Sequence, residues 1–277
     1  MPLRFSYPRR RGATWIRIGL AVALAIELLA GRPARAQAPS VDTLLARLFG
    51  AEERTPYELT ADFNGQLVLS IRGGRLVVAA EGSFLESRGA DGVKRRKVTI
   101  KRLDLPLLLR PFAGAVRRVI EEKIETQAET PETFHAHEMF ILTELPGRRY
   151  VLVGVHRSIV DEAIDRYGQP QDKKDPLVRR KIAQWLFTAP TMREFLVRPG
   201  PPYALRAIVD EDGQLYELAL FYDWGEVSTR ISYILLNGEP VWRQITADTV
   251  SELAGVGRVD GQLVLNFFNH CANCRRP

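Results

Sequence analysis

The stretch Tyr57–Ile71, YELTADFNGQLVLSI, decides the fold. Every odd-numbered position in it is apolar or small, and every even-numbered position except Val68 is polar. Successive side chains of a strand point to opposite faces, so this period of two predicts one buried face and one solvent-facing side. At ~3.3 Å per residue such a strand would span about 50 Å. We therefore expect it to curve or break, with Gly65 as the bend point.

Turn residues connect this stretch to further strands. Arg72-Gly73-Gly74 leads into a strand at about 75–86, and Gly89–Gly92 leads into another at about 93–101. Connections this short allow only antiparallel pairing. Asn237-Gly238 is the strongest hairpin signal in the chain. The remaining predicted strands cover about 134–145, 149–156, 203–209, 215–222, 227–236, 241–250 and 258–268.

Helical periodicity appears near 40–49, 107–126, 158–167 and 175–187. Asp175-Pro176 combines an N-cap residue with a first-turn proline, which marks the start of the last of these helices. The predicted fold class is therefore α+β. We expect a large curved antiparallel β-sheet, an incomplete barrel, with helices packed on its concave face. A helical insertion around 157–197 would interrupt the strands of a single domain, 37–277.

The first 36 residues have the pattern of a signal peptide that is cleaved on export. Arg9, Arg10 and Arg11 form a basic start, Ile18–Leu29 is a short apolar core, and Ala34-Arg35-Ala36 is a small-x-small cleavage site. The apolar core is shorter than the ~20 residues that a spanning helix needs. We expect a soluble protein in the periplasm or another extracytoplasmic compartment. An uncleaved N-terminal anchor is the alternative.

Removal of this leader changes the charge of the protein. The whole chain has 39 Lys and Arg against 33 Asp and Glu, which gives a net charge of +6. The leader holds seven arginines and Glu27, so 32 of each sign remain in the mature chain. A nucleic-acid-binding protein needs a net basic surface, and we expect no nucleic-acid partner.

The two cysteines, Cys271 and Cys274, lie close together near the C-terminus. In an exported protein the pair predicts a local disulfide. Zinc bound by His270, Cys271 and Cys274 is an alternative that supplies three ligands, one fewer than a structural site needs. A redox-active pair is a further alternative.

Two other clusters need an explanation. His135 and His137 would share one face if they lay on a strand, and could then bind a metal together; a polar, solvent-facing edge is the simpler interpretation. Lys94, Arg95, Arg96 and Lys97 form a dense basic run on a predicted hairpin. This run could contact anionic lipid headgroups or protect a sheet edge from pairing.

A family resemblance follows from the order of these elements. The quoted segments are the long strand 59–67 (LTADFNGQL), the small-residue strand 79–84 (AAEGSF) and the closing hairpins with 218–221 (LALF) and 231–233 (ISY). An exported chain of this design resembles the bacterial outer-membrane lipoprotein carriers, the LolA- and LolB-like proteins. That resemblance implies an incomplete barrel that holds acyl chains between sheet and helices. It is one of architecture, and no functional residue carries over from it.

We therefore expect an envelope protein that binds a lipid or an acylated protein in the concavity of a curved sheet, without catalysis and without a cofactor. The candidate lipid-binding residues are the apolar side chains of the first two strands and of the 107–126 helix, namely Leu59, Phe63, Leu67, Leu69, Val78, Phe84, Phe112 and Val116. The alternatives are a non-catalytic structural or interaction module of the envelope, and a metal- or thiol-dependent enzyme that uses the C-terminal His-Cys-x-x-Cys.

Overall fold

The computed structural model describes residues 38–49, 57–72, 74–88, 94–126, 131–253 and 257–273. The chain divides into two units, Met1–Ser40 and Val41–Pro277, and the fold described below is that of the second. The expected leader, residues 1–36, lies outside the described residues. Within the described ranges, no helix has the length and apolar character needed to cross a bilayer.

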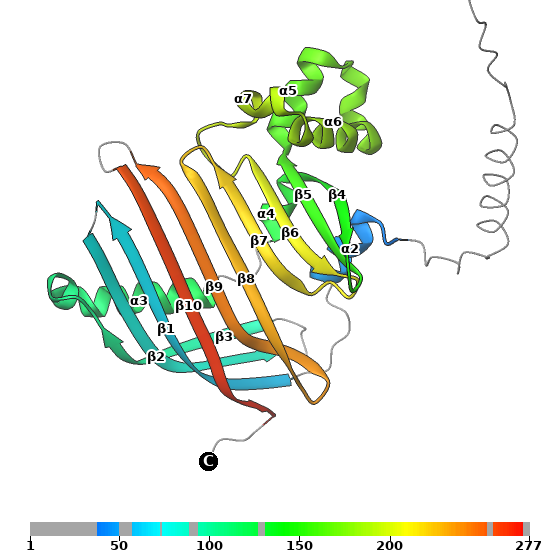
Figure 1. Ribbon diagram of the computed structural model, residues 1–277. Helices are drawn as coiled ribbons and strands as arrows, with labels where there is room; N and C mark the ends of the chain where they lie inside the picture. The colour runs from blue at the N-terminus through cyan, green and yellow to red at the C-terminus, as the bar shows by residue number, and fades with distance from the viewer. Residues whose placement is uncertain are drawn as a thin grey trace, which may run out of the picture. The chain divides into compact units, whose positions relative to one another are not determined.

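Ten antiparallel strands form one open sheet in the order β3-β2-β1-β10-β9-β8-β7-β6-β5-β4 (Figure 1). The strands are β1 (Tyr57–Ile71), β2 (Gly74–Arg88), β3 (Lys94–Asp104), β4 (His137–Leu145), β5 (Arg149–His156), β6 (Ala204–Asp210), β7 (Leu215–Tyr222), β8 (Gly225–Leu236), β9 (Glu239–Leu253) and β10 (Gly257–Ala272). The first and last strands of the chain, β1 and β10, pair with each other inside the sheet. The edge strands are β3 and β4. The predicted fold class is confirmed: α+β, with a curved antiparallel sheet that does not close into a barrel.

The pairing register carries one apolar face across nine strands. Directly paired residues point to the same side of a sheet. Starting from Leu67, the register gives a row whose members are apolar except Thr229. In spatial order the row is Val78, Leu67, Leu263, Ala247, Thr229, Leu218, Ala207, Leu152 and Ile141. A neighbouring row on the same face is Leu76, Leu69, Gly261, Thr249, Val227, Leu220, Leu205, Gly154 and Met139.

Glycines on this face make room for large neighbouring side chains. A Cβ added at Gly82 would lie 2.7 Å from a ring carbon of Phe63, and one at Gly261 would lie 3.0 Å from Leu69 Cδ2. A Cβ at Gly65 would collide with Leu265. Gly65 is therefore not a break in β1, which runs uninterrupted; the register shift against β10 lies between Thr60 and Asp62 instead.

The opposite face of the central strands is polar. Asn266 Nδ2 donates to Asn64 Oδ1 at 2.9 Å, and Gln244 Nε2 donates to Asn266 Oδ1 at 2.7 Å. These amides form a hydrogen-bonded ladder across β1, β10 and β9. The alternation predicted for Tyr57–Ile71 therefore continues into the strands that pair with it.

Three helices lie on the apolar face of the sheet. Helix α2 (Val41–Phe49) and the short α4 (Pro131–His135) bring Leu44 and Phe134 against Leu152 and Leu205. The 3₁₀ helix η1 (Leu107–Phe112) leads into α3 (Ala113–Thr126), which passes behind β10 and β9 in Figure 1. Its Ile120 packs with Phe63, Phe84 and Ile100 near the β3 edge.

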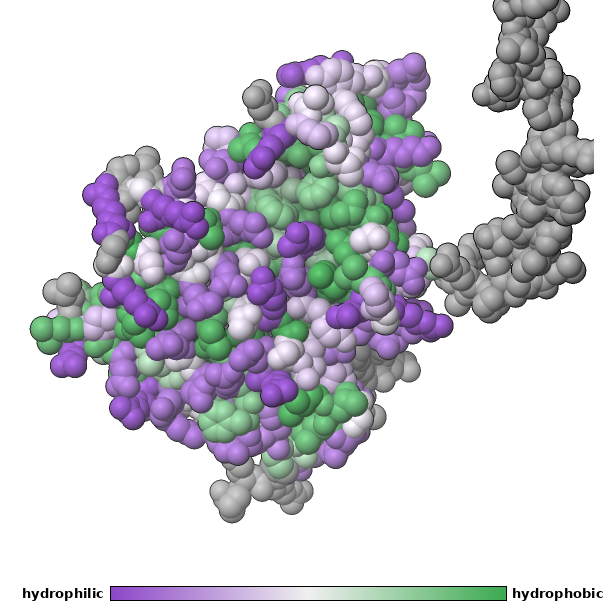
Figure 2. Space-filling model, viewed as in Figure 1, coloured by the Kyte–Doolittle hydropathy of each residue, from purple (hydrophilic) through white to green (hydrophobic). Residues whose placement is uncertain are grey.

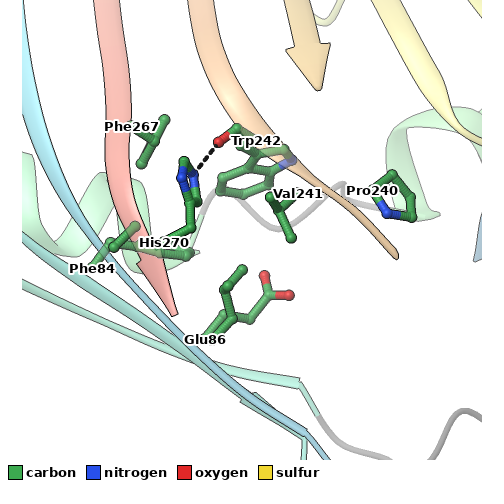
Figure 3. Close-up of a pocket in the computed structure, with 9 residues that line it drawn as sticks. Phe84, Glu86, Pro240, Val241, Trp242, Phe267 and His270 are labelled. Atoms are coloured by element: carbon green, nitrogen blue, oxygen red, sulfur yellow. Dashed lines mark hydrogen bonds between the residues drawn. The ribbon is translucent and has the colours of Figure 1, made fainter. Parts of the chain in front are cut away.

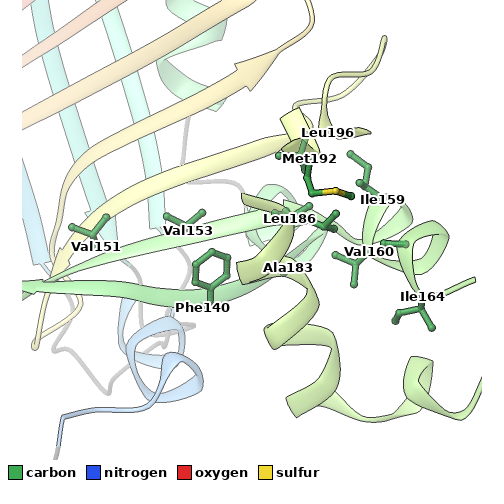
Figure 4. Close-up of a cluster of buried hydrophobic side chains, with 12 residues drawn as sticks. Phe140, Val151, Val153, Ile159, Val160, Ile164, Ala183, Leu186, Met192 and Leu196 are labelled. Atoms are coloured by element: carbon green, nitrogen blue, oxygen red, sulfur yellow. The ribbon is translucent and has the colours of Figure 1, made fainter. Parts of the chain in front are cut away.

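The helical segment between β5 and β6 packs on the other face. It contains α5 (Arg157–Tyr167), η2 (Pro170–Lys174), α6 (Pro176–Thr188), η3 (Pro190–Met192) and α7 (Arg193–Leu196). Figure 4 shows Val160, Ala183 and Leu186 of these helices gathered beside Val153 and Phe140 of the sheet. The sequence-based picture of helices on the concave face thus holds for α2, α3 and α4, whereas α5 and α6 cover the reverse side of β4 and β5.

An ion-pair network that is buried at Glu138 and Arg179 and exposed at Asp161 connects this segment to the sheet. Arg179 of α6 donates from Nε to Glu138 of β4 at 2.9 Å and from Nη1 to Asp161 of α5 at 2.5 Å. Asp175 caps α6 by accepting a hydrogen bond from the N–H of Leu177 at 2.8 Å. These contacts hold α5 and α6 on β4 and β5. The opposite face of these two strands is covered by α2 and α4.

Candidate functional site

The apolar face is covered unevenly along its length. Ala207 and Leu152, beneath α2 and α4, are buried, whereas Leu67, Leu263 and Ala247 in the central strands are only half-buried. The second row shows the same trend: Leu205 is buried, while the central residues Leu69, Val227 and Leu220 are half-buried. We call these half-buried residues of β1, β10, β9, β8 and β7 the apolar lane. The lane consists of Leu67, Leu69, Leu263, Ala247, Thr229, Val227, Leu218 and Leu220.

An aromatic cluster lies next to the lane on the same face, further along the strands β2, β1, β10 and β9. Phe84, Phe267 and Trp242 form a triangle with ring centroids 5.4–5.8 Å apart, and Phe63 lies 6.3 Å from Phe267. Ile120 of α3 packs against this cluster. The space between Phe63 and α3 is therefore occupied by packed side chains.

A small pocket opens beyond these aromatic rings (Figure 3). Its volume is about 40 Å³, enough for a few water molecules, since one needs about 10–15 Å³ on the same measure. Pockets that enclose small organic ligands usually measure about 300–1,000 Å³. The residues that line the pocket are Leu59, Ala61, Phe84, Glu86, Pro240, Val241, Trp242, Phe267 and His270.

A buried ion pair lies beside this pocket. Arg96 Nε donates to Glu86 Oε2 at 2.7 Å, and both side chains are almost fully buried. The Arg96 guanidinium also stacks over the Trp242 ring, 4.6 Å from its centroid, a cation–π arrangement. His270 Nε2 lies 2.7 Å from the backbone oxygen of Trp242, which fixes the imidazole against the pocket wall. The face of the Trp242 ring is therefore already covered by a cation of the same chain, the Arg96 guanidinium.

The structure brings together most of the sequence-predicted lipid-binding residues. The six strand residues lie on one face of β1 and β2, with Leu67 paired directly to Val78. Leu59 and Phe84 line the pocket, and Phe63 and Phe84 belong to the aromatic cluster. The two helical candidates differ from each other: Val116 is half-buried, whereas Phe112 is 61% exposed.

The basic run does not form one surface. Lys97 and Arg95 are exposed, but the buried Arg96 faces the opposite side of β3, where it pairs with Glu86. Alternation along a strand is the physical reason, because neighbouring residues cannot share a face. The prediction of a four-residue contact from Lys94 to Lys97 is therefore wrong for Arg96. The side chain of Lys94 lies outside the described residues.

The histidine pair also does not lie on one strand. His135 is the last residue of α4 and is exposed, whereas His137 begins β4 and is buried. The expectation that both imidazoles share a strand face is wrong, because α4 ends between them. Among the described residues, no cluster of three or more His, Cys, Asp or Glu side chains could hold a metal. Cys271 pairs with Thr60 in the sheet, and Cys274 lies outside the described residues; the disulfide remains a prediction.

His137 is held between two backbone oxygens. Its Nδ1 lies 2.6 Å from Thr133 O and its Nε2 lies 3.0 Å from Pro202 O. Burial nevertheless lowers the pKa of His137, with smaller contributions from His156 and Arg157, while the two backbone hydrogen bonds act in the opposite direction. Burial also lowers the pKa of His156, whose Nδ1 accepts from the N–H of Ser158 at the start of α5. The fold therefore favours neutral imidazoles at this junction.

Sequence reasoning did not bring Glu86, Arg96, Trp242 and His270 together, since it placed Arg96 in a basic surface run and His270 beside the cysteines. A usable signal existed for two of them: Glu86 continues the apolar register of β2, and Arg96 continues that of β3. Two opposite charges on the apolar sides of neighbouring strands indicate a buried pair. The contact of Trp242 with Arg96 depends on the pairing of β9 within the whole sheet, which no local pattern specifies.

Comparison with known proteins finds similarity only among solved structures. No family model and no curated protein matches the chain. A DUF1329 family protein from Desulfovibrio piger is 11% identical, with 84% of this chain and 92% of that chain covered and a TM-score of 0.45. A predicted outer membrane lipoprotein-sorting protein domain from Vibrio parahaemolyticus is 10% identical, with 85% and 92% covered and a TM-score of 0.35.

MucB, solved in complex with MucA, is also 10% identical, with 82% and 94% covered and a TM-score of 0.21. One of these neighbours carries the same kind of description as the family named from the sequence, an outer membrane lipoprotein-sorting domain. The similarity is one of fold.

Replacement of Arg96 should test the buried pair. R96M removes the arginine that pairs with the buried Glu86 carboxylate, and we expect the free energy of unfolding in urea to fall by about 3–5 kcal/mol. The matched control is R102M on the same strand, where Arg102 pairs with Asp104 at the surface and the expected loss is below about 1 kcal/mol. Equal, small losses in both variants would contradict the account.

The buried histidines should make stability depend on pH. An unfolded histidine titrates near pH 6.5, and the folded state lowers the pKa of His137 and His156. Stability is therefore complete above that pH and falls as the pH drops below it, because only the unfolded chain takes up the protons. The variant H137Q should flatten the slope of unfolding free energy between about pH 7.5 and 5.5. H135Q, at an exposed position, is the control; identical slopes in H137Q and the unmodified protein would refute this prediction.

Proposed function

We propose that this is an exported protein of the cell envelope that holds a lipid or an acyl chain against the apolar lane. The observation that carries the proposal is the unequal burial of one continuous apolar face. The lane residues Leu67, Leu263 and Ala247 are half-buried, although their row is fully buried at Ala207 and Leu152. Burial of apolar surface stabilises a complex by about 25 cal/mol per Å², so an alkyl chain laid along the lane gains free energy without any polar partner.

The positions of the closed regions define where such a chain would lie. The aromatic cluster lies on β2, β1, β10 and β9, with Ile120 and Leu263 packed against it. The cluster under α2 and α4 lies on β4 to β7, with Leu218 and Leu220 packed against it. The pocket of about 40 Å³ is too small for an alkyl chain. The proposed ligand therefore lies over the central strands, and of the eight sequence-predicted residues Leu67 and Leu69 are its direct contacts.

The second candidate function is a non-catalytic interaction module that binds no lipid. The packing of Ile120 against Phe63 and the small size of the pocket favour it. In that case the half-buried lane would be an ordinary sheet surface. The two functions differ in one measurable property, the affinity of the mature protein for an acyl chain.

A lane-filling substitution distinguishes them. A247F adds an aromatic ring in the middle of the lane, and we expect it to weaken binding of a dansyl-labelled fatty acid by at least about tenfold, since a steric block removes most of the apolar contact. The matched control is T246F, one residue away on the opposite face, which should bind as the unmodified protein does. Binding is read from dansyl fluorescence, with native mass spectrometry of the protein purified from its own host as a second readout.

Two results would refute the proposal. One is a mature protein that carries no lipid after purification and ignores added fatty acid. The other is an A247F variant that binds fatty acid as tightly as T246F. Either result would favour the interaction module.

A further inference from the structure

The η1 helix carries two exposed apolar side chains that do not pack into the core. Leu107 is 75% exposed and Phe112 is 61% exposed. The segment around them is nevertheless anchored, because Leu105 is buried and Ile120 packs into the aromatic cluster. Figure 2 shows hydrophobic atoms beside hydrophilic ones at the left margin of the view, where the α3 end of the molecule lies in Figure 1.

A second anchor ties α3 to the sheet edge. Glu121 accepts a hydrogen bond at Oε1 from the N–H of Ile100 in the edge strand β3, at 2.9 Å. A carboxylate on a backbone N–H is a charge-assisted bond. Leu107 and Phe112 therefore belong to a helical segment that is hydrogen-bonded to the sheet further along, at Glu121.

Positive charge surrounds these apolar residues. Arg110, Arg117 and Arg118 are exposed. Arg110 Nε donates to the backbone oxygen of Leu105 at 3.4 Å, and none of the three arginines forms an ion pair with another described residue. In the stretch from Leu107 to Glu121 the only acid is Glu121, whose carboxylate is engaged with the Ile100 N–H. Glu122, Lys123 and Glu125 follow in sequence, with side chains outside the described residues.

Exposure alone does not distinguish this surface. Leu235, at the tip of the β8–β9 hairpin, is also 75% exposed. Its neighbours in the hairpin, Ile234, Leu236, Asn237 and Glu239, include no basic residue. Leu177 of α6 is 67% exposed near Lys174 and Lys181 in sequence, but η1 alone adds an exposed phenylalanine, Phe112, to its exposed leucine among the described helices.

We propose that η1 and the first half of α3 dock this protein on the surface of an anionic lipid bilayer. Leu107 and Phe112 enter the headgroup region, and Arg110, Arg117 and Arg118 contact lipid phosphates. Segments that lie in a membrane interface combine apolar residues on one side with Lys or Arg on the other, and basic residues near an anionic leaflet each add to binding. The proposal is independent of the lane, because docking needs no lipid held against the sheet.

Vesicle co-sedimentation of the mature protein tests this inference. Vesicles of phosphatidylcholine alone are compared with vesicles in which about three lipids in ten are phosphatidylglycerol. We expect binding to the anionic vesicles that falls as salt rises from about 0.1 M to 1 M, because screening weakens the arginine contacts. The double variant L107A/F112A should lose at least about tenfold in affinity. The triple variant R110Q/R117Q/R118Q should lose about fivefold for each arginine.

The matched control is L235A, which removes an equally exposed leucine and should bind as the unmodified protein does. Circular dichroism melts confirm that the variants fold, and the salt dependence of the unmodified protein is a readout that needs no variant. Three results would overturn the inference: no binding to anionic vesicles, equal binding to both vesicle types, or a loss in L235A as large as in L107A/F112A. Dansyl-fatty-acid binding in solution by L107A/F112A separates a failure here from a failure of the lane.

Discussion

The antiparallel register from β2 to β4 is the constraint on which the rest of the structure depends. It aligns Val78, Leu67, Leu263, Ala247 and their partners into one row across nine strands, so a single face stays apolar through the whole sheet. A slip of one residue would turn every side chain of a strand to the other face. The glycines at 65, 82 and 261 belong to this constraint, because each leaves space for a large side chain of a neighbouring strand.

The uneven use of that face follows from where the helices lie. Strands β4 to β6 are covered on both sides, by α2 and α4 on one and by α5 and α6 on the other. The network of Glu138, Arg179 and Asp161 holds the second pair in place. On the apolar face of the central strands, α3 passes behind β10 and β9 in Figure 1, and its Ile120 packs against the aromatic cluster. Strands β4 to β6 are therefore packed on both faces, whereas the apolar residues of the central strands are only half-buried.

The sequence predicted the strands, the turns and the fold class, since period-two alternation and Asn237-Gly238 are local signals. It also placed Leu67, Leu69 and Val78 on one face. It did not predict which strand pairs with the other side of β1, because the pairing of β1 with β10 joins residues about 200 positions apart. The buried Arg96 shows the same limit: a run of four basic residues suggests a surface, whereas strand alternation and a partner on β2 bury one of them. The reverse-side packing of α5 and α6 was likewise beyond local patterns.

The most direct test of the apolar lane is photo-crosslinking with a diazirine-bearing fatty acid, mapped residue by residue by mass spectrometry. If the account is correct, adducts concentrate on Leu67, Leu69, Leu263 and Ala247, and unlabelled fatty acid suppresses them. The polar face of the same strands, Gln66 and Thr246, should remain unlabelled, because alternate residues face opposite sides. Adducts spread equally over both faces, or confined to α5 and α6, would contradict the account.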